Sequence, residues 1–364
     1  MKINIYFIFF LLLLSCNKND DKTIIIGDLT NLPDGVLYLY EDVYNNRIDS
    51  VITKKGKFFM KHTWFDGLDE PVYLGLDHIS KTGVLRAFSF PTNSKFKDDG
   101  YNSTYFFSDS IVTIKGKITE FEPVSVKLSE KVKLVVGPKI FAGYQTNALY
   151  NLDGDLFENI NKTSYNIVLS KIIEFPNSYH LLFQINNNRN SFTPLQVKKL
   201  LSVFKGEIIK SETFNTLSDY NAKRLENNKI AIPLLLDNSG KKVAILNPEY
   251  KKHLVVFWAS WCGPCRQEIP ALKEIYKKHN KDIEFVSIST DTNNSSWQKA
   301  VVKENMPWKQ LIVNENSKEY EPIEICFQVS NSIPYVALID NNMKVLKSTV
   351  GSMTEKELED FLKD

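Results

Sequence analysis

The chain has 364 residues but only 4 cysteines, too few for the disulfide framework that stabilises small secreted domains. Its 45 basic and 43 acidic side chains are spread along the chain and give a net charge of +2. It therefore has neither a basic nucleic-acid-binding face nor an acidic tail. Internal repeats and low-complexity tracts are also absent. A hydrophobic fraction of 43% then indicates a globular protein of two or three domains that does not bind nucleic acid.

The N-terminal apolar segment is too short to span a membrane. It runs from Ile3 to Leu14, 12 residues where a spanning helix needs about 20, and Lys2 precedes it as in a secretory signal. Its end, Leu13-Leu14-Ser15-Cys16, resembles a bacterial lipobox. That resemblance predicts a signal peptide over residues 1–15, acyl chains on Cys16 and a polar tether over 16–22. The alternative is a buried core helix with an incidental cysteine.

Lipidation of Cys16 places the protein in a bacterial cell envelope, because several acyl chains together give stable membrane anchoring. Asn17 stands where an inner-membrane retention signal has Asp, so we expect the outer membrane, with the protein facing the periplasm. The acidic pair Asp20-Asp21 keeps export to the cell surface open as a second location.

The next 200 residues divide into a β-rich and a helix-rich part. Short apolar runs separated by Gly, Pro and Asp predict a β-sandwich-like domain over 23–128, with strands at 23–26, 36–40, 58–60 and 110–114. Residues 129–228 contain apolar side chains at helical spacing, from Leu195 to Phe204 and from Leu217 to Leu225. We interpret this second part as a helical connector without a functional motif.

Residues 229–364 alternate between strand-like and helix-like segments, which is typical of an α/β domain. The continuous apolar run Leu254–Ala259 predicts a strand buried on both faces, and Arg266–His279 a helix packed against it. Further strands are expected at 284–289, 335–340 and 344–347, and further helices at 296–305 and after the capping box Thr354–Glu357.

Cys262 and Cys265 form a C-x-x-C pair between the buried strand and the helix. A zinc site needs two more ligands, and neither Cys326 nor the 5 histidines stand at ligand spacing, so we predict redox chemistry and no metal. At a helix N-terminus, free N–H groups and the helix dipole stabilise a thiolate. Cys262 is then the nucleophile that attacks a disulfide, and Cys265, one turn later, resolves the mixed disulfide.

The segment Phe257–Pro270 resembles thioredoxins, and more closely the TlpA/ResA group of membrane-tethered thiol-disulfide oxidoreductases. Ser332-Ile333-Pro334-Tyr335 matches the family segment whose proline is cis and lies opposite the cysteines. The resemblance covers the last third of the chain. It implies a thioredoxin-like fold and a substrate that pairs with the backbone beside the proline. It also implies a substrate-binding rim made of Trp261, Gly263, Pro264, Ile333 and Pro334.

Glu268 stands where ResA-like proteins place a glutamate, three residues after the second cysteine, whereas the acidic strand position of plain thioredoxin is Val256 here. A partly buried carboxylate near Cys265 has a raised pKa and can accept the proton of the resolving thiol. The alternative is an exposed glutamate that only complements the helix dipole. Cys326 has no counterpart in the family, and we expect it to be a buried, inert thiol.

These features predict a thiol-disulfide oxidoreductase, and Gly263-Pro264 favours reduction over oxidation. Its substrates are expected to be disulfide-containing exported proteins, and its electrons to come from a membrane protein of the DsbD/CcdA kind. No cofactor is expected beyond the Cys262–Cys265 disulfide. The pattern around Gly27, Asp49 and Gly56 in the β-rich domain resembles a domain that often precedes thioredoxin modules. An alternative function is therefore a surface-binding lipoprotein whose main role lies in this β-rich domain. A peroxiredoxin-like peroxidase ranks lower, because Val255 and Ala259 replace its Pro and Thr.

Overall fold

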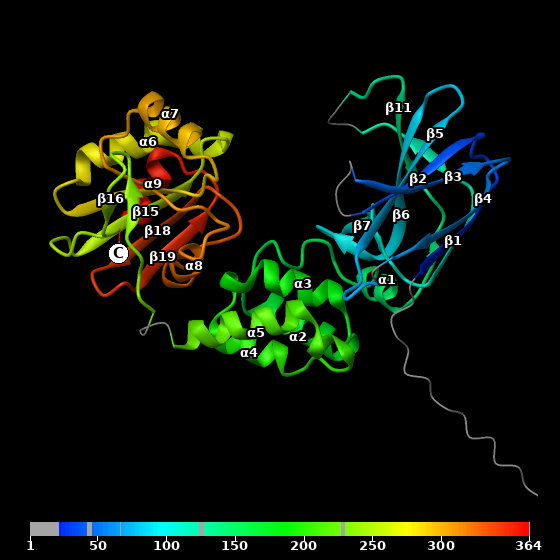
Figure 1. Cartoon of the computed structure of the whole chain (residues 1–364), viewed down its shortest axis with the longest axis horizontal. Helices are drawn as coiled ribbons and strands as arrows, with labels where there is room; N and C mark the ends of the chain where they lie inside the picture. Colours follow the sequence, from blue (N-terminus) through cyan, green and yellow to red (C-terminus); the bar gives the residue numbers. More distant parts are fainter. Residues whose placement is uncertain (1–21, 42–45, 66, 124–126, 227–229, 364) are drawn as a thin grey trace, which may run out of the picture. The chain divides into compact units, whose positions relative to one another are not determined.

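The computed structural model describes residues 22–41, 46–65, 67–123, 127–226 and 230–363. The chain forms two compact units, which Figure 1 shows in sequence colours. The N-terminal unit comprises residues up to 181 together with 205–212, and the C-terminal unit comprises 182–204 and 213–364. The predicted signal peptide over 1–15 and the predicted lipidation site Cys16 lie outside the described residues. Within the described ranges, no helix is both long enough and apolar enough to cross a membrane.

The N-terminal unit is built around two β-sheets, as the short apolar runs predict. A four-stranded sheet has the order β12-β9-β1-β4, and a larger sheet has the order β10-β11-β6-β5-β2-β3, with β7 paired to β6 and β8 to β5. Buried and half-buried residues alternate along β1 after the exposed Lys22, which is the pattern of a strand with one face on a core. The strands are β1 (Lys22–Leu29), β2 (Gly35–Glu41), β3 (Arg47–Thr53), β4 (Lys57–Thr63), β5 (Tyr73–Ser80), β6 (Leu85–Phe96), β7 (Asp99–Ser103), β8 (Phe106–Phe107), β9 (Ile111–Gly116), β10 (Thr119–Phe121), β11 (Val132–Val136) and β12 (Ile140–Phe141).

The helical region begins later than the sequence predicts and is not a single connector. Strands β11 and β12 fall inside the predicted connector over 129–228, so the β-rich part ends at Phe141 and not at residue 128. These strands are only five and two residues long, too short for a periodic pattern to show. The helices that follow are divided between the two units. They are α1 (Tyr144–Leu149), α2 (Lys162–Glu174), α3 (Tyr179–Asn187), α4 (Pro194–Leu201) and α5 (Glu212–Leu225).

The C-terminal unit has a seven-stranded sheet of order β14-β13-β17-β16-β15-β18-β19. The interior strand β15 (Lys252–Trp258) pairs in parallel with β16 (Ile283–Ser289) and antiparallel with β18 (Tyr335–Asp340). The remaining strands are β13 (Leu235–Asp237), β14 (Lys242–Val243), β17 (Lys309–Ile312) and β19 (Val345–Val350). The helices are α6 (Gly263–His279), α7 (Asn294–Glu304), α8 (Tyr320–Phe327) and α9 (Glu355–Leu362).

Helices cover both faces of this sheet (Figure 1), which explains the unbroken apolar sequence of β15. On one face, Val256 packs in a core with α6, α7 and α9. On the other, Val255 and Phe257 pack in a core with α8. The capping box at Thr354 opens α9, as expected. The layered sheet places the end of β15, and hence the cysteine pair, at one edge of the core.

Candidate functional site

The cysteine pair lies where β15 gives way to α6. Cys262 is the N-terminal cap of α6, and its Sγ accepts a hydrogen bond from the backbone N–H of Cys265 at 3.2 Å. The two residues form a disulfide, with their Cα atoms 5.3 Å apart. Both side chains are buried. Because the amide of Cys265 and the helix dipole point at Cys262, the reduced site stabilises negative charge on that sulfur.

The residues predicted to form a substrate rim surround this pair. Trp261 is 68% exposed, and Gly263 and Pro264 are exposed as well. The Ile333–Pro334 peptide bond is cis, and the carbonyl oxygen of Ile333 lies 3.8 Å from Cys262 Sγ. The structure thus brings together two segments about 70 residues apart in sequence, as the resemblance implies. An extended peptide placed along Ile333 would present its own backbone and disulfide to Cys262.

Glu268 lies on the first turns of α6, one turn after Cys265, and is only 2% exposed. Its Oε1 accepts a hydrogen bond from the backbone N–H of Met353 at 2.8 Å, whereas Oε2 has no protein partner. Burial raises the pKa of Glu268 to about 7, against a smaller lowering by the Met353 amide. The glutamate is therefore buried and not the exposed first-turn residue of the alternative interpretation. A carboxyl group with this pKa exchanges protons near neutral pH.

Asp291 is a site residue that the sequence analysis missed. Its side chain is buried after β16 and accepts hydrogen bonds from Ser260 N at 2.8 Å, Ser260 Oγ at 2.6 Å and Ser289 Oγ at 2.6 Å. Ser260 is two residues before Cys262, so Asp291 fixes the loop that carries the nucleophile. A single aspartate after a strand has no distinguishing sequence signal, because only the tertiary fold brings it to this loop.

A polar cluster around the buried carboxylate of Glu324 supports the segment that leads into Ile333, and no pattern in the sequence marks it. Arg189 pairs with Glu324 of α8 at 2.6 Å. Asn190 Nδ2 donates to Glu324 Oε1 at 3.0 Å and to the carbonyl oxygen of Val329 at 2.7 Å. Asn331 Nδ2 also donates to the carbonyl oxygen of Asn187. Residues 187–190, in the helical segment before the α/β domain, therefore hydrogen-bond the segment 329–331 that precedes the substrate rim. The helical segment is more than a connector.

Cys326, the remaining cysteine, has no part in this site. Cys326 is half-buried on α8, and burial raises the pKa of its thiol, which disfavours the reactive thiolate. Trp258 is buried in the core of α6, α7 and α9. Across the described ranges, no three His, Cys, Asp or Glu side chains are arranged to hold a metal ion.

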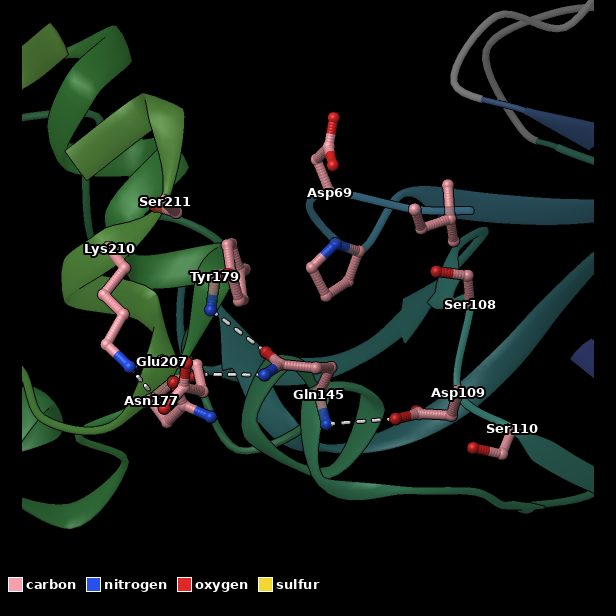
Figure 2. Close-up of a pocket in the computed structure, with 12 residues that line it drawn as sticks. Asp69, Ser108, Asp109, Ser110, Gln145, Asn177, Tyr179, Glu207, Lys210 and Ser211 are labelled. Carbon is pink, nitrogen blue, oxygen red and sulfur yellow. Dashed lines mark hydrogen bonds and ion pairs between the residues drawn. The ribbon is translucent and has the colours of Figure 1, made fainter. Parts of the chain in front are cut away.

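The N-terminal unit contains a separate polar cleft with a volume of about 500 Å³ (Figure 2). Its polar groups mostly bind one another: Gln145 Nε2 donates to the carbonyl oxygen of Asn177, and Lys210 pairs with Glu207. Asp109 accepts hydrogen bonds from the backbone N–H groups of Gln145 and Thr146 at the start of α1. The cleft contains no cysteine, and the disulfide chemistry belongs to the C-terminal unit alone.

Comparison with known proteins places this geometry in a family. A family model described as Redoxin matches residues 214–363. The thioredoxin-like protein YneN of Bacillus subtilis is 30% identical over 125 residues, which cover 34% of this chain and 71% of the relative. The chain belongs to the thioredoxin superfamily.

A ResA protein and a solved thioredoxin-like structure are also among the similar proteins. The thiol-disulfide oxidoreductase ResA of Bacillus thuringiensis subsp. konkukian is 28% identical over 133 residues, covering 36% of this chain and 72% of the relative. The solved structure of StoA from Bacillus subtilis aligns at 20% identity and a TM-score of 0.31, covering 37% of this chain and 98% of that chain. The C-terminal unit of this thioredoxin-superfamily protein is a thiol-disulfide oxidoreductase domain. The N-terminal β unit lies outside the Redoxin match.

Proposed function

We propose that the protein is a disulfide reductase that acts on exported proteins through the Cys262–Cys265 dithiol. The observation that carries the proposal is the position of Cys262 Sγ, at the N-terminus of α6 and 3.8 Å from the Ile333 carbonyl oxygen. An extended segment of a partner protein can align with the backbone at Ile333 and place its disulfide against this sulfur. Exposed Trp261 offers an aromatic surface to the same partner.

The reaction consists of two thiol-disulfide exchanges. The Cys262 thiolate attacks one sulfur of the partner disulfide, forms a mixed disulfide and releases the other partner sulfur as a thiolate, which takes a proton from solvent. Cys265 then loses its proton to Glu268 and attacks Cys262 Sγ, which breaks the mixed disulfide and releases the second partner sulfur as a thiolate. That thiolate takes a proton from solvent, and Glu268 returns its proton to solvent. The partner gains two electrons and two protons, and Cys262–Cys265 becomes a disulfide.

The role of Glu268 follows from its surroundings. Its unpartnered Oε2 is buried, and the raised pKa makes the carboxylate basic enough to accept a proton from Cys265 near pH 7. Helix positions three residues apart lie on the same face, so Glu268 follows Cys265 on the inward face of α6. As Glu268 titrates, the resolving step becomes faster with rising pH through about 7.

Return to the dithiol state requires an electron donor, since each turnover leaves a disulfide. We propose a membrane dithiol protein of the DsbD/CcdA kind as the donor and acyl chains on Cys16 as the anchor that keeps the two proteins on one membrane. The outer membrane, facing the periplasm, is the proposed location. The protein itself then needs no cofactor besides its own disulfide.

Insulin reduction with dithiothreitol as electron source tests the proposal. We expect Cys262→Ser to lower turnover by at least about a thousand-fold, because the nucleophile is lost. Cys326→Ser is the matched control and is expected to retain wild-type turnover. Equal activity of the Cys262→Ser variant and the wild type would contradict the proposal and favour the surface-binding alternative. Turnover of hydrogen peroxide but not of insulin would favour the peroxidase.

A further inference from the structure

The outer face of the four-stranded sheet in the N-terminal unit combines exposed aromatic and aliphatic side chains with lysines. Inward-facing residues of β1, β4 and β9 are buried, so their neighbours in sequence all point to the other side. Phe59 is 58% exposed, Ile111 55% and Phe141 67%. Large apolar side chains are seldom left this exposed in a group, which marks the surface as a place of interaction.

Strand register joins these residues into one patch, which we call the outer face. Ile26 of β1 lies between Phe59 of β4 and Thr113 of β9, and Thr113 in turn faces Phe141 of β12. One step along the sheet, Ile24 lies between Lys61 and Ile111. The residues paired in register form rows that cross the sheet from strand to strand, and neighbouring strands are about 4.8 Å apart. The apolar groups form a continuous surface and are not scattered single residues.

The charges on the outer face are predominantly positive. Lys57 and Lys115 lie on either side of Asp28, the one carboxylate in these registers. Lys61 lies next to Ile24, and Lys22 is exposed at the start of β1. Aromatic side chains surrounded by lysines are complementary to a membrane surface, where anionic headgroups lie above an apolar acyl-chain region.

The length of the chain before β1 brings this face close to a membrane. Cys16, the proposed lipid-bearing residue, is six residues before Lys22, and six residues span at most about 20 Å when fully extended. Lys22 belongs to the outer face, and Phe65, which is almost fully exposed, lies just beyond the partner of Lys22 in β4. With the acyl chains in the bilayer, the outer face cannot be far from the lipid headgroups.

We propose that the outer face of the β12-β9-β1-β4 sheet binds an anionic lipid surface, which makes it a second membrane contact beside the acyl anchor. This inference rests on the proposed lipidation of Cys16, but the contact itself is a property of the folded sheet. Phe59, Phe141 and Ile111 enter the interfacial region, and Lys61 and Lys115 bind lipid phosphates. The N-terminal unit then helps to keep the protein bound to the membrane.

Vesicle co-sedimentation tests the contact without the anchor. The protein is the chain over residues 16–364 carrying Cys16→Ser, and the vesicles contain phosphatidylethanolamine and phosphatidylglycerol, with phosphatidylcholine vesicles as the neutral comparison. We expect binding to the anionic vesicles that weakens with added salt. The double variant Phe59→Asp/Phe141→Asp is expected to bind about tenfold more weakly, since both apolar contacts are replaced by repulsive charges.

Val302→Asp is the matched control, because Val302 is a highly exposed apolar residue of α7 in the other unit. It should leave vesicle binding unchanged, and thermal unfolding should show that all variants are folded. Lys61→Glu/Lys115→Glu, which keeps the apolar groups, should weaken binding to anionic vesicles only. No binding by the folded wild type, or equal binding by the Phe59→Asp/Phe141→Asp variant, would overturn the inference.

Two further measurements distinguish the lipid contact from self-association of the protein and from the proposed acyl anchor. A wild-type dimer that Phe59→Asp/Phe141→Asp converts to a monomer, in analytical ultracentrifugation, would assign the face to a second copy of the chain and overturn the lipid contact. Mass spectrometry of the full-length protein from a bacterial host reports acylation of Cys16 independently. An unacylated Cys16 in a chain whose outer face still binds vesicles would remove the proposed anchor but support the lipid contact.

Discussion

Each unit buries an ionisable side chain, and the pKa values of the two side chains lie in different ranges. In the N-terminal unit, His78 of β5 is fully buried, and burial together with nearby Arg86 lowers its pKa to about 4. In the C-terminal unit, burial of Glu268 raises the pKa of that carboxyl to about 7. Burial therefore favours the neutral form of both groups, but only Glu268 titrates near neutral pH.

The surroundings explain the difference. His78 hydrogen-bonds Thr53 through Nε2 at 3.0 Å, and its buried Nδ1 has no protein partner. Its neighbours across the sheet are Leu37 and Arg86 and not a cysteine. Glu268 lies one helical turn from a cysteine and keeps one oxygen unpartnered. A neutral buried group in the first unit preserves the core, whereas the same effect in the second unit brings the pKa of the proposed proton acceptor into the neutral range.

The largest stability effect is expected at the partly buried ion pair that supports the substrate rim. Glu324→Ala leaves the largely covered Arg189 without its carboxylate and should lower the free energy of unfolding of the C-terminal unit by about 3 to 4 kcal/mol. The matched control is Glu321→Ala, a change on the same helix as Glu324 that removes the exposed ion pair between Glu321 and Lys223. It should lower the free energy of unfolding by less than about 1 kcal/mol. Hydrogen exchange measured by mass spectrometry resolves the two units. Similar losses in both variants would mean that burial of the pair does not matter.

The pH dependence of the C-terminal unit should follow Glu268. Its folded pKa of about 7 exceeds the ordinary value of 4.5, so the folded state holds a proton that the unfolded state has released. Stability of the unit should therefore fall as pH rises from 4.5 to 7, by about 3 kcal/mol. Glu268→Gln should remove most of this slope and also flatten the rise of insulin turnover through pH 7. An unchanged pH profile in Glu268→Gln would exclude Glu268 as the proton acceptor.

The N-terminal unit should respond to pH with the opposite sign through His78. Its folded pKa of about 4 is below the ordinary 6.5, so the unfolded state takes up a proton first as the pH falls. This group should cost the unit about 2 kcal/mol of stability between pH 6.5 and 4.5. His78→Gln should reduce that loss, which hydrogen exchange of β2 and β5 can follow. A wild type and a His78→Gln variant with the same acid sensitivity would contradict the assignment.

The smallest effect is expected at Asp291, which is fully hydrogen-bonded and positions the loop before Cys262. Asp291→Asn keeps the shape of the side chain but replaces one acceptor oxygen with an NH2 group and removes the negative charge that accepts three hydrogen bonds. We expect a loss of about 1 kcal/mol in stability together with several-fold slower insulin turnover. Ser260→Ala, which removes one of the three hydrogen bonds, should have a weaker effect on both. A lower stability with unchanged turnover would make Asp291 a purely structural residue.

The sequence predicts the parts of this protein that local patterns encode. The apolar run before Cys262, the helix after it and the capping box at Thr354 all form where expected, because each depends on neighbouring residues. The placement of Ile333 and Pro334 beside Cys262 came from the family resemblance. Asp291, Arg189 and Asn190 went undetected, because their partners lie 30 to 140 residues away and no local pattern encodes such contacts.

Trapping the mixed disulfide tests the central claim most directly. Cys265→Ser is incubated with an oxidised protein substrate, digested without reduction and analysed by mass spectrometry. We predict a stable covalent complex in which substrate cysteine is bonded to Cys262 and not to Cys326. A complex that forms through Cys326, or no complex with any disulfide-containing substrate while the variant is folded, would contradict the account.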